Sequence, residues 1–343
     1  MTGPARREIP NSTPAATASG VFSFCLLALL LLPLRSSIPG GIVQEAGIQT
    51  GRWSRTLVLA PGGHLDLVNI SGSISVQRAS GRQVRLTALK RVALPSGSAA
   101  RTLLDAITIE IATTDSSAAV RVSHPAAGQI RQVSGREPEA VPLGVSFEIA
   151  LPRDLDVSIT TGSGDIVTRD TGGEVQLETR SGNVTVTDAA GIVEAGSMQG
   201  DIRIERAAGV RYVNTVSGGI VLSGIRGAIK ATCVSGDIEI RGGTPRMVEA
   251  SSTGGGIRWE GAVPPGSSFV LSSHSGTIEF IAGPSPGFAV NLSTVAGTII
   301  APLELVPTGA SISRRSVTGT WGEPQARVAL TAFSGDIILT IHP

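Results

Sequence analysis

Glycine returns every nine residues through the middle of the chain, and this spacing restricts the fold more than any other feature of the sequence. Two interleaved sets of glycines share an 18-residue period. A helix does not fit, because nine residues do not match a 3.6-residue turn and a glycine at each repeat would weaken the helix. The first set comprises Gly164, Gly182, Gly200, Gly218 and Gly236, and the second comprises Gly173, Gly191, Gly209 and Gly227.

Apolar residues recur at fixed distances from these glycines. The residues two positions after the first set are Ile166, Val184, Ile202, Ile220 and Ile238. They alternate with mixed residues, which predicts short strands with one buried face. Because the apolar columns align at an 18-residue pitch, we predict coils that stack in parallel, with equivalent strands about 4.8 Å apart. The nine glycines are then expected to be corners that need a positive φ or a close backbone approach.

The corner motif extends beyond the strict repeat and occurs ten times in all. The outlying copies are "NISGSISV" (69–76), "SSTGGGIRW" (251–259), "SHSGTIEF" (273–280), "TVAGTIIA" (294–301) and "AFSGDIIL" (332–339). Arg211 stands where the half-unit column requires an apolar residue. We therefore expect a local register shift there that uses Val210 and Tyr212.

The composition along the chain suggests three parts. Residues 1–45 are expected to form a signal peptide or membrane anchor, residues 46–158 a β-rich cap, and residues 159–343 the β-solenoid repeats with a C-terminal closing strand. Within the cap, residues 95–106 predict one short helix and residues 124–144 a polar loop. Caps protect the open strand edges at the ends of a solenoid, so we expect a monomer.

The N-terminus has the character of an export signal. Arg6 and Arg7 precede an uncharged run of 14 residues, Val21–Leu34. This length suits the apolar core of a signal peptide better than a bilayer span, which needs about 20 apolar residues. No clear cleavage site follows, so both cleavage and retention as an anchor stay open. We expect an exported protein of the cell envelope, periplasmic or extracellular.

One polar column directly follows the corner glycines of the first set. It comprises Asp165, Asn183, Asp201, Gly219 and Asp237. Stacked carboxylates can bind calcium, with Asp165, Asp201 and Asp237 as the ligands. Asp and Asn also tolerate turn geometry and accept hydrogen bonds from nearby backbone amides. We favour the turn interpretation, because Gly219 interrupts the column.

The sequence gives little evidence for a zinc site, a nucleic-acid surface or a catalytic site. Thr179, Ser197, Thr215 and Cys233 form a second column, in which we expect the hydroxyls to satisfy backbone groups. Two cysteines and four scattered histidines give no zinc-ligand spacing, and a net charge of +1 gives no basic footprint for nucleic acid. No nucleophile elbow or phosphate-binding loop occurs. The sequence therefore predicts no catalytic residue and no cofactor.

The order of these motifs resembles a known family. An early "NISGSISV", then "VSFEIALPRDLDVSITTGSGDI", the stacked S-G-D-I units and a final "VALTAFSGDIILTI" are similar to the bacterial "putative adhesin" family, a domain of unknown function with related head-GIN and toast-rack β-repeat modules. The resemblance covers roughly residues 50–343. It implies a right-handed, mostly parallel β-solenoid that is exported or membrane-tethered, and it brings no catalytic residues.

Three functions are consistent with these observations. We expect a non-enzymatic, adhesin-like module that binds an unknown protein or glycan at the cell envelope. A β-helix hydrolase or lyase that acts on polysaccharide is an alternative, because such enzymes share this architecture. A membrane-anchored sensor of envelope stress is the third, and it requires Val21–Leu34 to stay attached.

Overall fold

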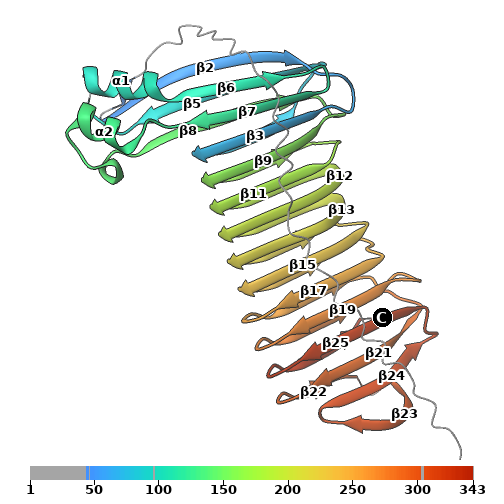
Figure 1. Ribbon diagram of the computed structural model, residues 1–343. Helices are drawn as coiled ribbons and strands as arrows, with labels where there is room; N and C mark the ends of the chain where they lie inside the picture. The colour runs from blue at the N-terminus through green and yellow to red at the C-terminus, as the bar shows by residue number, and fades with distance from the viewer. Residues whose placement is uncertain (1–43, 46, 96, 303–304, 343) are drawn as a thin grey trace, which may run out of the picture. The chain divides into compact units, whose positions relative to one another are not determined.

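The computed structural model describes residues 44–45, 47–95, 97–302 and 305–342 (Figure 1). The chain divides into two units, residues 1–32 and 33–343, and every described residue belongs to the second. The apolar run Val21–Leu34 lies outside the described residues. Within them, strands dominate and only two α-helices occur, α1 (Ser98–Ala106) and α2 (Ala127–Ser134).

The repeats form a stack of parallel coils, as the 18-residue period predicts. Each coil consists of a long strand, a glycine corner, a short strand and a second corner. The stacked elements are β9 (Asp156–Ser163), β10 (Ile166–Arg169), β11 (Val175–Ser181), β12 (Val184–Gln199), β13 (Ile202–Ser217), β14 (Ile220–Ser223), β15 (Ala228–Ser235), β16 (Ile238–Arg241), β17 (Met247–Ser252), β18 (Ile257–Gly261), β19 (Ser268–Ser273) and β20 (Ile278–Ala282). The predicted column is in register from Ile166 to Ile238, each residue pairing with its equivalent one coil away. The all-β solenoid fold is thereby confirmed.

The N-terminal elements continue the same two strand ladders. Strands β3 (His64–Ser71) and β4 (Ile74–Arg78) pair in parallel with β9 and β10. Beyond them lie β7 (Ser117–Ser123) and β8 (Leu143–Leu151), which pair with β3 and β4. Antiparallel strands then end each ladder: β6 (Thr108–Thr113) on one side, and β5 (Gln83–Val92), β2 (Ile48–Val58) and β1 (Gln44–Glu45) on the other. The helix predicted at 95–106 is α1, whereas the predicted loop at 124–144 contains α2 and a short 3-10 helix (Pro138–Ala140).

The C-terminal coil does not lie at the end of the stack. Strand β25 (Ala326–Ala332) pairs with β19 on one side and β21 (Gly287–Thr294) on the other. Likewise β26 (Ile337–Ile341) lies between β20 and β22 (Ile299–Ile300). The last segment of the sequence is therefore inserted one coil inward, and β21, β24 (Ser316–Gly322) and β23 (Val306–Ser313) lie beyond it. This order differs from the expected closing strand: β25 separates β21 from β19, and β21 also pairs with β24.

Apolar side chains fill the space between the two ladders. The strict coils bury Val, Ile and Ala, whereas the longer coils after Gly236 bury aromatic rings. Trp259 lies 4.7 Å from Phe269, and Phe269 lies 5.4 Å from Phe280, between ring centroids. Larger side chains are needed there because the inserts lengthen each coil and widen its interior.

The first set of glycines forms one continuous column of close backbone contacts. A Cβ atom on Gly200 would lie 2.0 Å from the carbonyl oxygen of Gly182, and one on Gly182 would lie 2.3 Å from that of Gly164. No side chain fits at such distances, and these residues also have φ between 121° and 151°. The column runs through all ten motif copies, in the spatial order Gly72, Gly164, Gly182, Gly200, Gly218, Gly236, Gly255, Gly276, Gly335 and Gly297.

The second set of glycines behaves differently. Gly173, Gly191 and Gly227 meet neighbouring carbonyl oxygens at 2.0–2.5 Å, but Gly209 has no atom within 3.7 Å of an added Cβ. None of the four has a positive φ. The left-handed residue of this corner stands three positions earlier, in the column Asp170, Asp188, Arg206, Gly224 and Gly242, with φ between 51° and 65°.

The register shift expected at Arg211 is present. Val193 pairs with Val210, and Glu194 pairs with Tyr212, so Arg211 is the extra residue of a bulge. Val210 and Val213 are buried, whereas Tyr212 is only half-buried on the outer face. The bulge keeps apolar residues inward, but it uses Val213 where we had expected Tyr212.

Candidate interaction surface

The aspartate column acts as a ladder of backbone acceptors. The carboxylate Oδ1 of Asp165 accepts the amide of Asn183 at 2.7 Å, and Oδ1 of Asn183 accepts the amide of Asp201 at 2.9 Å. Asp201 and Asp237 do the same for Gly219 and Gly256, each at 2.7 Å. Each side chain thus satisfies an amide at the next corner of the stack, as the turn interpretation requires.

The same geometry bears on the calcium interpretation. Gly219 separates Asp201 from Asp237, which leaves these two carboxylates two coils apart, about 9.6 Å. Among the described residues, no group of three or more His, Cys, Asp or Glu side chains is arranged to hold a metal ion. A calcium ion in this column would compete with the amides for one oxygen of each carboxylate.

The hydroxyl column lies inside the coil and bonds to the corner glycines. Ser197 Oγ donates to Gly182 O at 3.0 Å, and Thr215 Oγ1 donates to Gly200 O at 3.1 Å. Cys233 occupies the next position, with Sγ 3.3 Å from Gly218 O. Burial raises the pKa of the Cys233 thiol, which disfavours the reactive thiolate. This column is structural, as the sequence suggested.

Charged side chains on the outer faces pair with one another across coils. Arg211 Nη1 lies 2.5 Å from Glu174 Oε1 and 2.6 Å from Glu194 Oε1. Arg258 joins Glu260 and Glu279 on the opposite ladder. The hydrogen bond from Arg211 holds the pKa of Glu174 below its usual value. These carboxylates are ionised partners in surface ladders, which does not provide the acid–base pair that a glycosidase needs.

One corner of the stack carries exposed apolar side chains in consecutive coils. Met198, Val216 and Val234 occupy equivalent positions in consecutive coils, and their exposed fractions are 53%, 46% and 51%. The chain neighbours of these residues are uncharged, and Arg180 stands at the equivalent position one coil beyond Met198. The column continues in spatial order, and we call the whole set the corner ridge: Met198, Val216, Val234, Thr253, His274, Phe333 and Val295.

Two rings reinforce the far part of the corner ridge. His274 and Phe333 stack with their centroids 4.7 Å apart and their planes 4° from parallel. Half of Phe333 is exposed, as is half of Val295 in the adjacent coil. A row of exposed apolar side chains of this length on a protein surface is typical of an interaction site. The sequence analysis missed it, although the M-Q-G, V-S-G and V-S-G triplets before three corner glycines were a readable signal.

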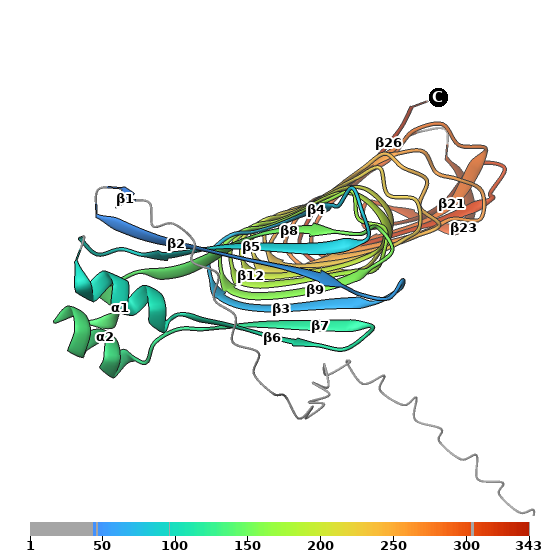
Figure 2. The same ribbon diagram turned by 90° about the horizontal axis from the view of Figure 1, so that it is seen from above.

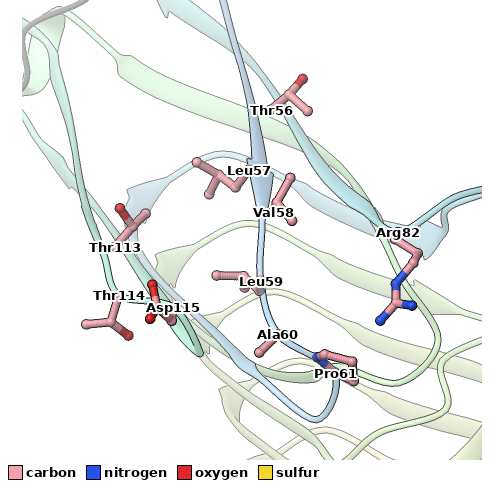
Figure 3. Close-up of a pocket in the computed structure, with 10 residues that line it drawn as sticks. All are labelled: Thr56, Leu57, Val58, Leu59, Ala60, Pro61, Arg82, Thr113, Thr114 and Asp115. Carbon is pink, nitrogen blue, oxygen red and sulfur yellow. The ribbon is translucent and has the colours of Figure 1, made fainter.

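A cleft of about 740 Å³ lies at the N-terminal end of the described unit (Figure 3). Its lining comes from the end of β2, the β4–β5 turn and the β6–β7 turn. Leu57 and Leu59 are buried in its wall and Val58 is exposed, while Arg82 and Asp115 stand on opposite sides. Asp115 is the single carboxylate in the lining, so this cleft has no pair of convergent acidic groups.

Comparison with known proteins gives matches among solved structures and to one family model. None of the helices in the described residues is long and apolar enough to cross a bilayer. No curated protein matches the chain. Similar solved structures include a "putative cell adhesion protein" from Clostridium sporogenes (10% identity, 85% of this chain and 100% of that one, TM-score 0.29). A second is a "putative adhesin" from Bacteroides fragilis, with 15% identity over 84% of this chain and 96% of that one and a TM-score of 0.41. A third is a "putative lipid binding protein" from Parabacteroides distasonis, with 12% identity over 84% of this chain and 96% of that one and a TM-score of 0.40.

A family model agrees with the architecture described above. The model described as Toastrack DUF4097 matches residues 108–340, which include the coils from β9 onward and the inserted C-terminal coil. Because this match spans more than half of the sequence, the chain belongs to the Toastrack DUF4097 family.

Proposed function

We propose that the protein is a non-enzymatic, extracytoplasmic and adhesin-like module that binds its partner through the corner ridge. The observation that carries the proposal is the row of exposed Met198, Val216 and Val234 in three consecutive coils, at a corner where the residues before and after each of them are uncharged. Elsewhere the same face of the stack bears paired charges. A partner that buries this row gains apolar contacts without stripping water from an ion.

The stacking geometry suits such a role. Successive ridge side chains are about 4.8 Å apart, so an extended partner meets an equivalent contact at every coil. Solenoids present long, regular binding surfaces for this reason. We propose that the protein works as a monomer and that the partner is a protein or glycan of the cell envelope, in keeping with the export signal.

The charged groups support a binding role over a catalytic one. Glu174, Glu194 and Glu279 each have an arginine partner, and these pairs lie on the outer strand faces. Cys233 is buried with a raised pKa. These three carboxylates and this thiol thus take part in structural contacts.

Cell fractionation and a binding assay test the proposal together. The full chain, produced with a C-terminal tag in a bacterial host, should be found in the envelope or the medium. Met198→Thr, Val216→Thr and Val234→Thr combined should weaken sedimentation of the purified protein with isolated envelopes by at least about tenfold, since a few central contacts dominate most interfaces.

A matched variant controls for the loss of exposed apolar area. Met247, Val270 and Ile300 have exposed fractions of 55%, 47% and 55%, close to those of the ridge residues, but lie off the ridge, so their replacement by Thr should leave envelope binding unchanged. Retention of the protein in the cytoplasm, or an equal loss in both triple variants, would contradict the proposal.

A further inference from the structure

One sheet face at the N-terminal end differs in charge from the rest of the unit. Strands β2 and β5 pair along their whole length, from Gln49 opposite Val92 to Val58 opposite Gln83 (Figure 2). Their inner face is covered by α1, whose Leu103 and Leu104 are buried. Lys90 points to this side and donates to the carbonyl oxygen of Ile107 at 2.6 Å. The outer face is therefore the only face of this strand pair that is left open by the described residues.

Arginines occupy that open face. Arg52 on β2, Arg85 and Arg91 on β5, and Arg82 in the β4–β5 turn are all exposed. We call these four residues the arginine face. Strands β2, β5 and β8 contribute a single acidic residue, Glu148. Within the described part of the chain, none of the four arginines has an ion-pair or hydrogen-bond partner.

Several arginines of the coils do have such partners. Arg203, Arg206, Arg211, Arg241 and Arg258 all pair with carboxylates there. Unpaired guanidinium groups gathered on one strand pair attract anions, and a guanidinium group matches the geometry of a phosphate. The full chain has a net charge of only +1, so any attraction to an anionic surface has to come from a local concentration of charge.

The register fixes the spacing of the arginine face. Arg52 is opposite Leu89, which makes Arg91 its diagonal neighbour at about 7–8 Å. Arg91 lies six residues after Arg85 on the same strand, a distance of about 20 Å. Guanidinium groups spread over this distance match a surface with many phosphates better than a single small anion.

Two neighbouring features favour a membrane as that surface. Val58 is 70% exposed at the end of β2 and pairs with Gln83, which makes Arg85 its diagonal neighbour, so an apolar contact adjoins the charges. Peripheral membrane binding commonly combines these two contributions. In the sequence, the uncharged run ends at Leu34, 14 residues before β2 begins at Ile48, so no more than about 50 Å of chain separates them.

We infer that the arginine face docks on anionic phospholipid headgroups. The arginines supply attraction to the phosphates and Val58 a shallow apolar contact. This inference does not depend on the corner ridge, whose side chains lie on the opposite ladder, and either proposal can fail without the other.

Vesicle sedimentation of the full chain tests the inference. Binding to vesicles of phosphatidylcholine mixed with phosphatidylglycerol should exceed binding to phosphatidylcholine alone, and the excess should fall with added salt. The neutral vesicles report what Val21–Leu34 contributes, so the difference between the two vesicle types isolates the arginine face. Arg52→Gln, Arg85→Gln and Arg91→Gln combined should reduce that difference by about tenfold or more.

A control of equal charge makes the test specific. Arg226, Arg246 and Arg327 are exposed and lie on the coils, so Gln at these three positions changes the net charge equally. This control should keep the preference for anionic vesicles, and circular dichroism should show both triple variants folded. An equal loss in both variants, no preference for anionic vesicles, or equally tight binding to a DNA duplex would overturn the inference.

Discussion

Asp188 and Arg206 stand one coil apart at the same corner, and both have a left-handed backbone, with φ of 58° and 55°. Their side chains form a two-point ion pair, with Arg206 Nε 2.6 Å from Asp188 Oδ1 and Nη2 3.0 Å from Oδ2. The next two coils have Gly224 and Gly242 at this position. The corner therefore requires a left-handed backbone, and different residue types can adopt it.

This requirement predicts how substitutions at Asp188 behave. Asp188→Asn should leave the urea midpoint of unfolding nearly unchanged, because Asn tolerates a positive φ and the exposed ion pair contributes little. Asp188→Val should lower the midpoint clearly, because a β-branched side chain is strained at this φ. Equal midpoints for the two variants would contradict a conformational requirement at this corner.

The Arg211 bridge predicts a pH-dependent contribution to stability. The pKa of Glu174 is lower in the folded protein than its ordinary value of 4.5, chiefly because of the hydrogen bond from Arg211. The ionised carboxylate therefore stabilises the fold above that ordinary value, and the contribution is lost as the pH falls through the folded pKa.

Urea unfolding of the wild type and Arg211→Gln between pH 7 and pH 3 measures this contribution. The gap in midpoint between the two proteins should be widest near neutral pH and should shrink below about pH 4.5. Arg226→Gln, at an exposed arginine without this bridge, should give no such change of gap. A difference in midpoint that stays constant with pH would show that Arg211→Gln lowers stability through lost packing alone.

Gly200 and Gly209 are predicted to differ although they belong to the same nine-residue repeat. Gly200→Ala should destabilise the fold by about 3 kcal/mol or more, because its Cβ would lie 2.0 Å from Gly182 O and its φ is 149°. Gly209→Ala should change stability by no more than about 1 kcal/mol, because the nearest atom is 3.8 Å away. Thermal unfolding of both variants checks this, and similar losses would show that the two glycine sets are equivalent.

Thr168 and Thr215 are buried threonines with opposite predicted responses to valine. Thr168 lies between Val76 and Val186, and its hydroxyl has no hydrogen-bond partner. Thr168→Val should stabilise the fold by about 1 kcal/mol, because it removes a buried, unsatisfied polar group. Thr215→Val should destabilise it by about 1 kcal/mol, because Gly200 O loses its donor. Urea unfolding measures both, and a loss of stability in Thr168→Val would contradict this account of the core.

Asp201 distinguishes turn chemistry from calcium binding. Asp201→Asn should leave the free energy of unfolding nearly unchanged, because Asn183 already accepts a backbone amide in this column. Asp201→Ala should lower it by about 1 kcal/mol, because the Gly219 amide loses its acceptor. The thermal midpoint of the wild type should be the same with calcium and with chelator. A midpoint raised by calcium would show selective binding to the native state and would make the column a metal ladder.

The sequence determined the repeating part of the structure. Each strand of the strict coils packs on its equivalent 18 residues away, so the pattern along the chain is also the pattern of contacts between coils. For that reason the 18-residue register from Ile166 to Ile238, the backbone ladder of Asp201 and the hydroxyl ladder of Thr215 could be predicted. The bulge at Arg211 could also be expected, because one residue had to be displaced to keep the column apolar.

The tertiary structure alone decided the features that join segments of no fixed spacing. The insertion of β25 between β19 and β21 depends on which open edge fits it best, and no period records that choice. The left-handed corner at Asp188 and Arg206 was missed because Arg206, a residue type that rarely adopts a positive φ, interrupts a column of Asp and Gly. The corner ridge and the arginine face emerged only when exposure and ion-pair partners were known. The burial of a side chain and its ion-pair partners depend on where the whole chain lies in space. The strands and corners of the repeat follow from the local alternation of apolar residues and from the spacing of the glycines.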